Sequence, residues 1–195
     1  MKTVIICDID GVVADSSIRL KRYSNYKALE RGDYNAFRVS MQAYNCTSLE
    51  DDVVIENGCE LLHSLINYYS PTRVIFLTSR GEESRGNTLD WLNTYVSDVK
   101  SKDLIMRPSH PEIAPGIYWR EGDPKFDHVA YKRSVVENLM ADGYEIVMAI
   151  DDHAPICDMY QSIGIPAIVV KWPGIDCLTT SGMNMNAGAL VGAIK

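Results

Sequence analysis

Four short runs of aliphatic and β-branched residues constrain the fold of this chain more than any other feature. They cover residues 3–7, 73–77, 145–150 and 167–170, and a weaker fifth run covers residues 103–106. None of them alternates between apolar and polar positions, which is typical of strands buried on both faces of a parallel sheet. The sequence therefore predicts a parallel sheet that is covered on both sides.

Helical patterns lie between the predicted strands. Apolar residues recur at helical spacing in residues 61–69, 89–96, 129–141 and 156–163, and Pro71, Gly143 and Gly164 mark the ends of three of these patterns. Strands and helices that alternate in this way predict a doubly wound, Rossmann-like α/β fold with right-handed crossovers. At 195 residues, the chain is expected to form one domain.

Three segments do not fit this alternation. Residues 14–56 are too long for a connection and contain helix-like, tyrosine-rich sequence, so we expect a helical cap inserted after the first strand, with a core made of residues 1–13 and 57–172. Residues 107–128 contain four prolines and are expected to form a structured loop. The tail, residues 173–195, is rich in Gly, Asn and Met and is expected to lie over the core.

Composition narrows the class of protein and the kind of partner. The formal net charge of −7 argues against a broad footprint on duplex nucleic acid, but it allows an enzyme that binds one phosphate at a strand end. No apolar run is long enough to cross a membrane, and no signal peptide is expected. The five cysteines lack metal-binding spacing, so we expect reduced thiols and a cytoplasmic location.

Polar motifs stand at or near the ends of the predicted strands. In an open α/β sheet, ligands bind beyond the carboxyl ends of the strands, so these motifs are expected to meet at one site. Each motif alone is weak evidence for such a site, but the order of the motifs along the chain makes the prediction specific. They are Asp8-Ile9-Asp10-Gly11, Thr78-Ser79-Arg80, Lys132 in a helix, and Asp151-Asp152.

Asp8 and Asp10 have the chemistry and the spacing for phosphoryl transfer. Residues i and i+2 of a strand face the same side, so both carboxylates are expected to reach one phosphate. Asp8 would attack phosphorus and form an aspartyl-phosphate. Asp10 would protonate the departing alcohol and then accept a proton from the water that attacks the intermediate. Gly11 would let the chain turn sharply away.

The number of carboxylates in the motifs requires a cation. Each pair of like charges about 4 Å apart costs about 4 kcal/mol at an effective dielectric constant of about 20, and the few basic side chains cannot offset several such pairs. An all-oxygen ligand set favours Mg²⁺. The expected ligands are Asp8, the main-chain carbonyl of Asp10 and Asp151, with Asp152 orienting them.

Thr78 and Lys132 are expected to hold the non-bridging phosphate oxygens. Simpler interpretations stay open for these motifs. Thr78 and the Asp151-Asp152 pair could cap the helices that follow them, and Lys132 could be a solvated helix residue. Capping and metal binding by the aspartate pair are compatible with each other.

The order of the four motifs resembles that of the haloacid dehalogenase (HAD) superfamily of phosphohydrolases. The segments LTSRGEES, GDPKFDHVAYK and IDDHAPICDMYQSIGIPAIVV are further similar to the 3'-phosphatase domain of phage polynucleotide kinase-phosphatase, and the resemblance covers about residues 3–171. It implies a HAD-like fold and substrate-binding roles for Arg19, Ser79, Arg80 and Asp127. Arg19, Arg80 and Asp127 could equally be surface charges or members of internal ion pairs.

The residues and the resemblance together predict a Mg²⁺-dependent phosphomonoesterase that removes 3'-phosphates from nucleic-acid ends or from 3'-nucleotides. No Walker A loop is present, so a stand-alone phosphatase is expected. Two alternatives stay open: a 5'-nucleotidase or small-molecule phosphatase of the same superfamily, and an inactive HAD-like binding module. The sequence does not decide between DNA and RNA as the substrate. It also leaves the oligomeric state open, and a homo-oligomer is one of the possible states.

Overall fold

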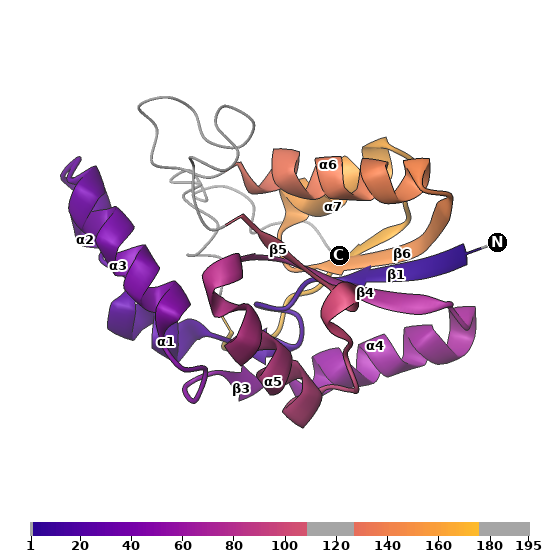
Figure 1. Ribbon diagram of the computed structural model, residues 1–195, viewed down its shortest axis with the longest axis horizontal. Helices are drawn as coiled ribbons and strands as arrows, with labels where there is room; N and C mark the ends of the chain where they lie inside the picture. The colour runs from indigo at the N-terminus through magenta and orange to yellow at the C-terminus, as the bar shows by residue number, and fades with distance from the viewer. Residues whose placement is uncertain (1, 109–126, 176–195) are drawn as a thin grey trace, which may run out of the picture.

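Five strands form one parallel sheet in the order β5-β4-β1-β6-β7. The computed structural model of the chain describes residues 2–108 and 127–175. Each of the five apolar runs forms a strand, which confirms the predicted α/β fold (Figure 1). The strands are β1 (Lys2–Cys7), β4 (Arg73–Gly81), β5 (Leu104–Arg107), β6 (Tyr144–Asp151) and β7 (Ala167–Val169).

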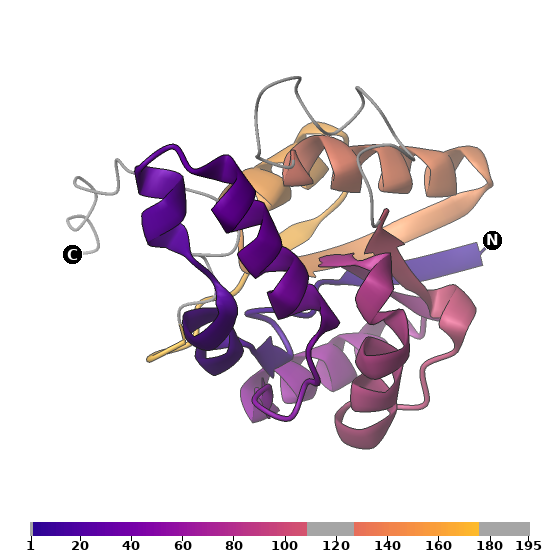
Figure 2. The same cartoon turned by 60° about the vertical axis from the view of Figure 1, so that its left-hand side comes forward.

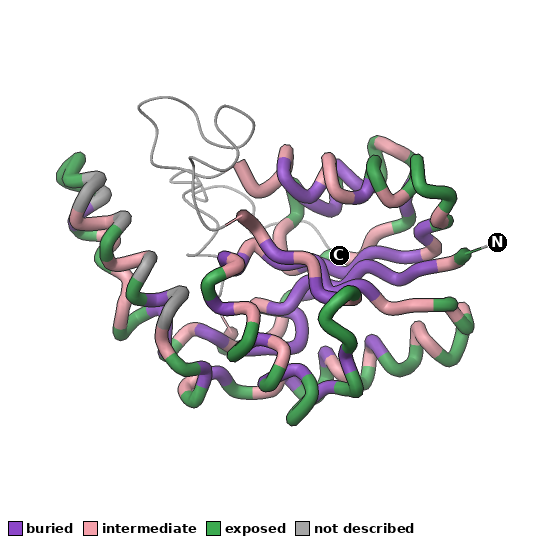
Figure 3. Tube along the Cα trace, viewed as in Figure 1, coloured by how far each residue is buried: buried purple, intermediate pink, exposed green. Residues whose placement is uncertain are grey.

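Helices cover both faces of the sheet, as the alternation predicts. Successive residues of β1 enter different cores: Ile5 belongs to a core that contains Leu62 and Leu92, and Ile6 belongs to one that contains Val136 and Ile156. The sheet is the most deeply buried layer, and the outer sides of the helices are exposed (Figure 3). The helices are α4 (Glu56–Tyr69) and α5 (Arg85–Tyr95) on one face, and α6 (His128–Ala141) and α7 (Ala154–Ser162) on the other, with the short 3-10 helices η1 (Glu82–Ser84) and η2 (Ser101–Asp103) in the connections.

The insertion after the first strand is helical, as predicted. An antiparallel pair of short strands, β2 (Ala14–Asp15) and β3 (Val53–Val54), closes its base. Figures 1 and 2 show α2 and α3 at the end of the molecule to which the carboxyl ends of the central strands point. We refer to residues 14–56 as the cap, and its helices are α1 (Ser17–Tyr23), α2 (Tyr26–Glu30) and α3 (Tyr34–Cys46).

Two of the predicted segments lie mostly outside the described residues. They are the loop expected over residues 107–128 and the tail expected over residues 173–195. Among the helices that the structure describes, none is both long enough and apolar enough to cross a membrane. The described part therefore comprises the sheet, the helices that cover it and the cap.

Gly58 allows α4 to approach the turn that follows β1. A Cβ atom at this position would lie 1.8 Å from the main-chain oxygen of Val12. The Gly58 amide donates a hydrogen bond to the carbonyl of Ile55 at 2.9 Å, which fixes the first turn of the helix. Because the close neighbour is backbone, a larger residue could be accommodated only if α4 or the turn moved.

Replacing Gly58 with alanine is therefore expected to destabilise the fold. The contact with Val12 should lower the free energy of unfolding by about 2 kcal/mol or more, as measured by denaturant unfolding. Gly86→Ala in α5 is the matched control, because a Cβ there would meet nothing within 4 Å. Alanine at that position should be neutral or stabilise the helix by about 0.5–1 kcal/mol. Equal stability of the two variants would contradict the proposed close approach.

Candidate active site

Asp8 and Asp10 follow the last residue of β1. The Asp8 amide donates to the carbonyl of Ile150 in β6 at 2.9 Å, which keeps Asp8 at the edge of the sheet. The carboxylate of Asp8 faces Lys132, whereas that of Asp10 binds Arg80. Because β1 ends at Cys7, the two aspartates stand in the loop beyond the strand and not within it as the sequence analysis assumed. That both carboxylates reach one phosphate stays a prediction.

Gly11 makes the turn after the two aspartates. Its φ of +77° lies in the left-handed region that glycine adopts without strain. A Cβ atom at this position would lie 2.3 Å from Oδ2 of Asp152. Gly11 therefore both turns the chain and leaves room for a carboxylate that arrives from the end of β6.

Three carboxylates converge at this edge of the sheet. Asp8, Asp151 and Asp152 each offer an oxygen, and these oxygens all lie within 4.8 Å of one another. Burial raises the pKa of Asp8 well above its usual value, although the charge of Lys132 opposes the shift. Burial and the nearby Asp151 raise the pKa of Asp152 to about 7. Such a cluster of hard oxygen donors, in which burial disfavours the charged forms of Asp8 and Asp152, is suited to a divalent cation.

Lys132 lies between two of these carboxylates. Its Nζ is 3.0 Å from Oδ1 of Asp8 and 2.7 Å from Oδ2 of Asp151, and its side chain is 1% exposed. Burial alone would lower the pKa of Lys132, but the charges of Asp151 and Asp8 raise it well above its usual value. Lys132 is therefore a charged, buried member of the site, and the alternative of a solvated helix residue does not hold.

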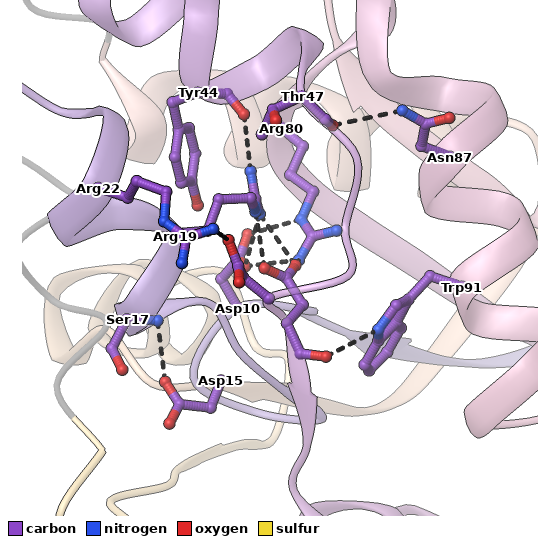
Figure 4. Close-up of polar contacts among 12 residues, drawn as sticks. Asp10, Asp15, Ser17, Arg19, Arg22, Tyr44, Thr47, Arg80, Asn87 and Trp91 are labelled. Carbon is purple, nitrogen blue, oxygen red and sulfur yellow. Dashed lines mark hydrogen bonds and ion pairs between the residues drawn. The ribbon is translucent and has the colours of Figure 1, made fainter.

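A second group of charges surrounds Asp10. Arg80 donates from Nε to Oδ2 of Asp10 at 2.9 Å and from Nη2 to Oδ1 at 2.7 Å, and Nη2 of Arg19 lies 4.0 Å from Oδ1 (Figure 4). Burial alone would raise the pKa of Asp10, but the charge and the hydrogen bonds of Arg80 outweigh it and lower the pKa to about 2. Asp10 is therefore an ionised carboxylate in the free protein.

Asp52 joins the two arginines, and the sequence analysis did not identify it. Its carboxylate accepts hydrogen bonds from Nε and Nη2 of Arg19 at 2.6 and 2.9 Å and from Nη2 of Arg80 at 2.7 Å. Both arginines are thus members of internal ion pairs, which is one of the two simpler interpretations left open above. No signal in the sequence distinguishes Asp52, because it is one of two adjacent aspartates near the end of the cap and belongs to no motif.

Thr78 and Ser79 lie within β4, which continues past both of them. The Thr78 side chain is buried, and its Oγ1 accepts a hydrogen bond from the Arg80 amide at 3.1 Å. The Ser79 carbonyl accepts a hydrogen bond from Nε of Arg107 at 2.9 Å. The Thr78 hydroxyl therefore shapes the segment that presents Arg80.

Two of the predicted site aspartates accept hydrogen bonds from main-chain amides near the start of a helix. Asp127 is the N-cap of α6, and its carboxylate accepts a hydrogen bond from the Ala130 amide at 2.9 Å. Asp151 accepts one from the amide of His153, the N-cap residue of α7, at 2.9 Å. The other oxygen of Asp151 binds Lys132. Since His153 is the N-cap of α7 and no side chain caps this helix, the interpretation of Asp151 and Asp152 as an N-cap pair does not hold.

The parallel sheet, the inserted cap and the acidic cluster at the carboxyl edge define a phosphatase fold of the haloacid dehalogenase type. The family model described as the polynucleotide kinase PNKP phosphatase domain matches residues 2–173. The chain therefore belongs to this family, which confirms the resemblance drawn from the motifs.

Solved structures share the fold at low sequence identity. A chain of the Pnkp1/Rnl/Hen1 complex matches with a TM-score of 0.53 and 20% identity, over 87% of this chain and 46% of that chain, so this chain spans less than half of that relative. A haloacid dehalogenase-like hydrolase from Streptococcus pneumoniae matches with a TM-score of 0.55 and 17% identity, over 87% of this chain and 85% of that chain. No curated protein matches the sequence.

Removing the charge of Lys132 is expected to destabilise the metal-free protein. Lys132→Met leaves Asp8 and Asp151 buried without their shared partner, which should cost about 3 kcal/mol of unfolding free energy in denaturant titrations with a chelator present. The adjacent Arg133→Met is the matched control. The contacts of Arg133 with Glu137 and Ser162 are exposed, so this change should alter stability by less than about 0.5 kcal/mol. Similar small effects of both changes would show that Lys132 does not balance the carboxylates.

Proposed function

We propose that this chain is a Mg²⁺-dependent phosphomonoesterase that forms an aspartyl-phosphate on Asp8. The observation that carries the proposal is the convergence of Asp8, Asp151 and Asp152 around the charged Lys132. One lysine cannot balance three carboxylates and a phosphate that brings about −2 charge, so the reaction needs a cation. Membership of a phosphatase family supports the reaction class.

The residues of the acidic cluster fit the proposed metal. Asp8, Asp151 and the main-chain carbonyl of Asp10 would hold Mg²⁺, with Asp152 orienting the ligands, and all of these donors are oxygens. When bound, the ion would offset the negative charge of the carboxylates and of the phosphate. The remaining chemistry is carried by side chains of the protein.

Asp8 is the proposed nucleophile. One of its oxygens forms a bond to phosphorus while the bond to the leaving oxygen breaks, which gives the aspartyl-phosphate and an alcohol. The Nζ of Lys132, which Asp8 and Asp151 hold in place, and the hydroxyl of Thr78 are proposed to bind the non-bridging phosphate oxygens. Water then attacks phosphorus, and Asp8 departs as a carboxylate.

Asp10 is the proposed proton donor and acceptor. Its pKa of about 2 keeps it ionised at rest, which is the form that accepts a proton from the attacking water. A phosphate dianion bound beside Asp10 raises its pKa by repulsion between like charges, which favours the protonated form that the departing alcohol requires. Asp10 gives up one proton and regains one in each turnover, so the steps balance.

The proposed substrates are 3'-phosphate ends of nucleic acid or 3'-nucleotides. The family supports a polynucleotide substrate, and one chain of similar fold comes from a structure described as the Pnkp1/Rnl/Hen1 RNA repair complex. The net charge of −7 suits an enzyme that binds a strand end more than one that covers a duplex. The substrate-binding residues remain predictions, and they are Arg19, Ser79, Arg80 and Asp127.

Binding of Mg²⁺ is expected to stabilise the metal-free protein, and the acidic cluster should account for the effect. At a concentration about 100-fold above its dissociation constant, the ion should add about 2.7 kcal/mol to the unfolding free energy and raise the melting temperature. Asp151→Asn should abolish most of this rise, whereas the exposed Asp90→Asn should retain it. If Mg²⁺ raised the melting temperature of Asp151→Asn as much as that of the wild type, the metal would bind at another site.

A substrate panel tests the proposed function most directly. It compares phosphate release from 3'- and 5'-phosphorylated DNA and RNA oligonucleotides, 3'- and 5'-mononucleotides and an aryl phosphate. We expect the highest kcat/KM with 3'-phosphates, a requirement for Mg²⁺ and a loss of at least about 1000-fold in Asp8→Asn, because that variant lacks the nucleophile. Equal or greater activity on 5'-mononucleotides would favour a 5'-nucleotidase, and no turnover of any substrate would favour an inactive binding module.

A further inference from the structure

Asp52 is a buried acid to which the proposed reaction assigns no role. Its side chain is 0% exposed, and its carboxylate accepts two hydrogen bonds from Arg19 and one from Arg80. Its main-chain carbonyl accepts a further hydrogen bond from Nε1 of Trp91 in α5 at 3.2 Å. Asp52 is thus fixed to the core through its backbone and to both arginines through its side chain.

Both arginines that bind Asp52 also face Asp10. Nη2 of Arg80 lies 2.7 Å from Oδ1 of Asp10 and 2.7 Å from Oδ2 of Asp52, so one nitrogen bridges the two acids. Arg19 is held further by the Tyr44 carbonyl at 2.9 Å, and its guanidinium lies 3.9 Å from the centre of the Tyr44 ring (Figure 4). The position of the Asp10 carboxylate therefore depends on two guanidinium groups that Asp52 holds.

The charges of this group balance without a metal. Two carboxylates, Asp10 and Asp52, face two guanidinium groups, Arg19 and Arg80. Without Asp52, the two guanidinium groups would face one carboxylate, and each would lose its shared acceptor. Such a change would alter the orientation of the groups around Asp10, because buried arginines move to find new acceptors.

The cap supplies two members of this group and a third residue that contacts it. Arg19 lies in α1, Tyr44 in α3 and Asp52 just before β3, whereas Asp10 and Arg80 belong to the core. The cap therefore reaches the proposed proton donor through buried ion pairs, and its fold and the geometry of Asp10 are linked.

We propose that Asp52 is a positioning residue for the phosphatase reaction: it holds Arg19 and Arg80 so that the Asp10 carboxylate can reach the leaving oxygen of the substrate. This inference rests on the proposed function. Asp52 does not touch the reacting atoms, and it acts only through the two arginines. The cap thereby contributes to catalysis by orienting the proposed proton donor, Asp10.

Substrates with different leaving groups distinguish a positioning role of Asp52 from a purely structural one. An alkyl alcohol departs poorly as an alkoxide and needs a proton from Asp10, whereas p-nitrophenolate departs without one. The ratio kcat/KM reports the steps up to the departure of the leaving group. A misplaced Asp10 should therefore lower kcat/KM far more for an alkyl phosphate than for p-nitrophenyl phosphate, while a partly unfolded enzyme loses both equally.

The experiment compares Asp52→Asn with the wild-type chain in Mg²⁺, using p-nitrophenyl phosphate and the nucleotide that the wild type hydrolyses best. We expect kcat/KM to fall about 100-fold for the nucleotide and by a much smaller factor for the aryl phosphate, with the same bias in Asp10→Asn. Asp52→Glu keeps the charge and should fold even if Asp52→Asn does not, and it should show the bias in the same direction.

Asp51→Asn is the matched control, because among the described residues Asp51 pairs with the exposed Arg22 alone, and this change should leave both rates unchanged. Equal falls for the two substrates in folded Asp52 variants, or no fall, would overturn the positioning role. A wild-type chain that hydrolyses neither substrate would overturn the proposed function itself, so the two failures are distinguishable.

Discussion

The ion pairs of the buried Lys132 with Asp8 and Asp151 are the interaction on which the rest of the site depends. They allow acidic residues from two strand ends to come together in a buried place, where like charges repel strongly. One positive charge still leaves the cluster of Asp8, Asp151 and Asp152 with a negative excess. A divalent cation would remove this excess, and in the proposed reaction it would also offset the charge of the phosphate.

Asp10 belongs to a group of a different kind, although it stands two residues from Asp8. Its group contains as many guanidinium groups as carboxylates, so it needs no cation, and it stabilises the ionised form of Asp10. The DxD spacing thus separates two functions. The first aspartate joins the group that is proposed to bind a metal and a phosphate. The second joins a group that ties the proposed proton donor to the cap.

Much of the fold and part of the site could be predicted from the sequence. The strands could be found because a residue run buried on both faces must be apolar throughout, and the acidic cluster because parallel strands bring their carboxyl ends to one edge. The orientation of Asp10 could not be predicted, because it depends on where β1 ends and on an ion pair with Arg80, which is 70 residues away. Asp52 was missed for a similar reason, since its role arises only from contacts between the cap and the core.

The central claim is that one divalent cation lies between carboxylates from the ends of β1 and β6. A crystal structure of the protein grown with Mn²⁺, with anomalous data collected at the manganese edge, tests it most directly. The account predicts a single strong peak in contact with oxygens of Asp8 and Asp151 and beside Asp152. A peak at another place, or Asp8 and Asp151 turned to different regions with no metal between them, would contradict it.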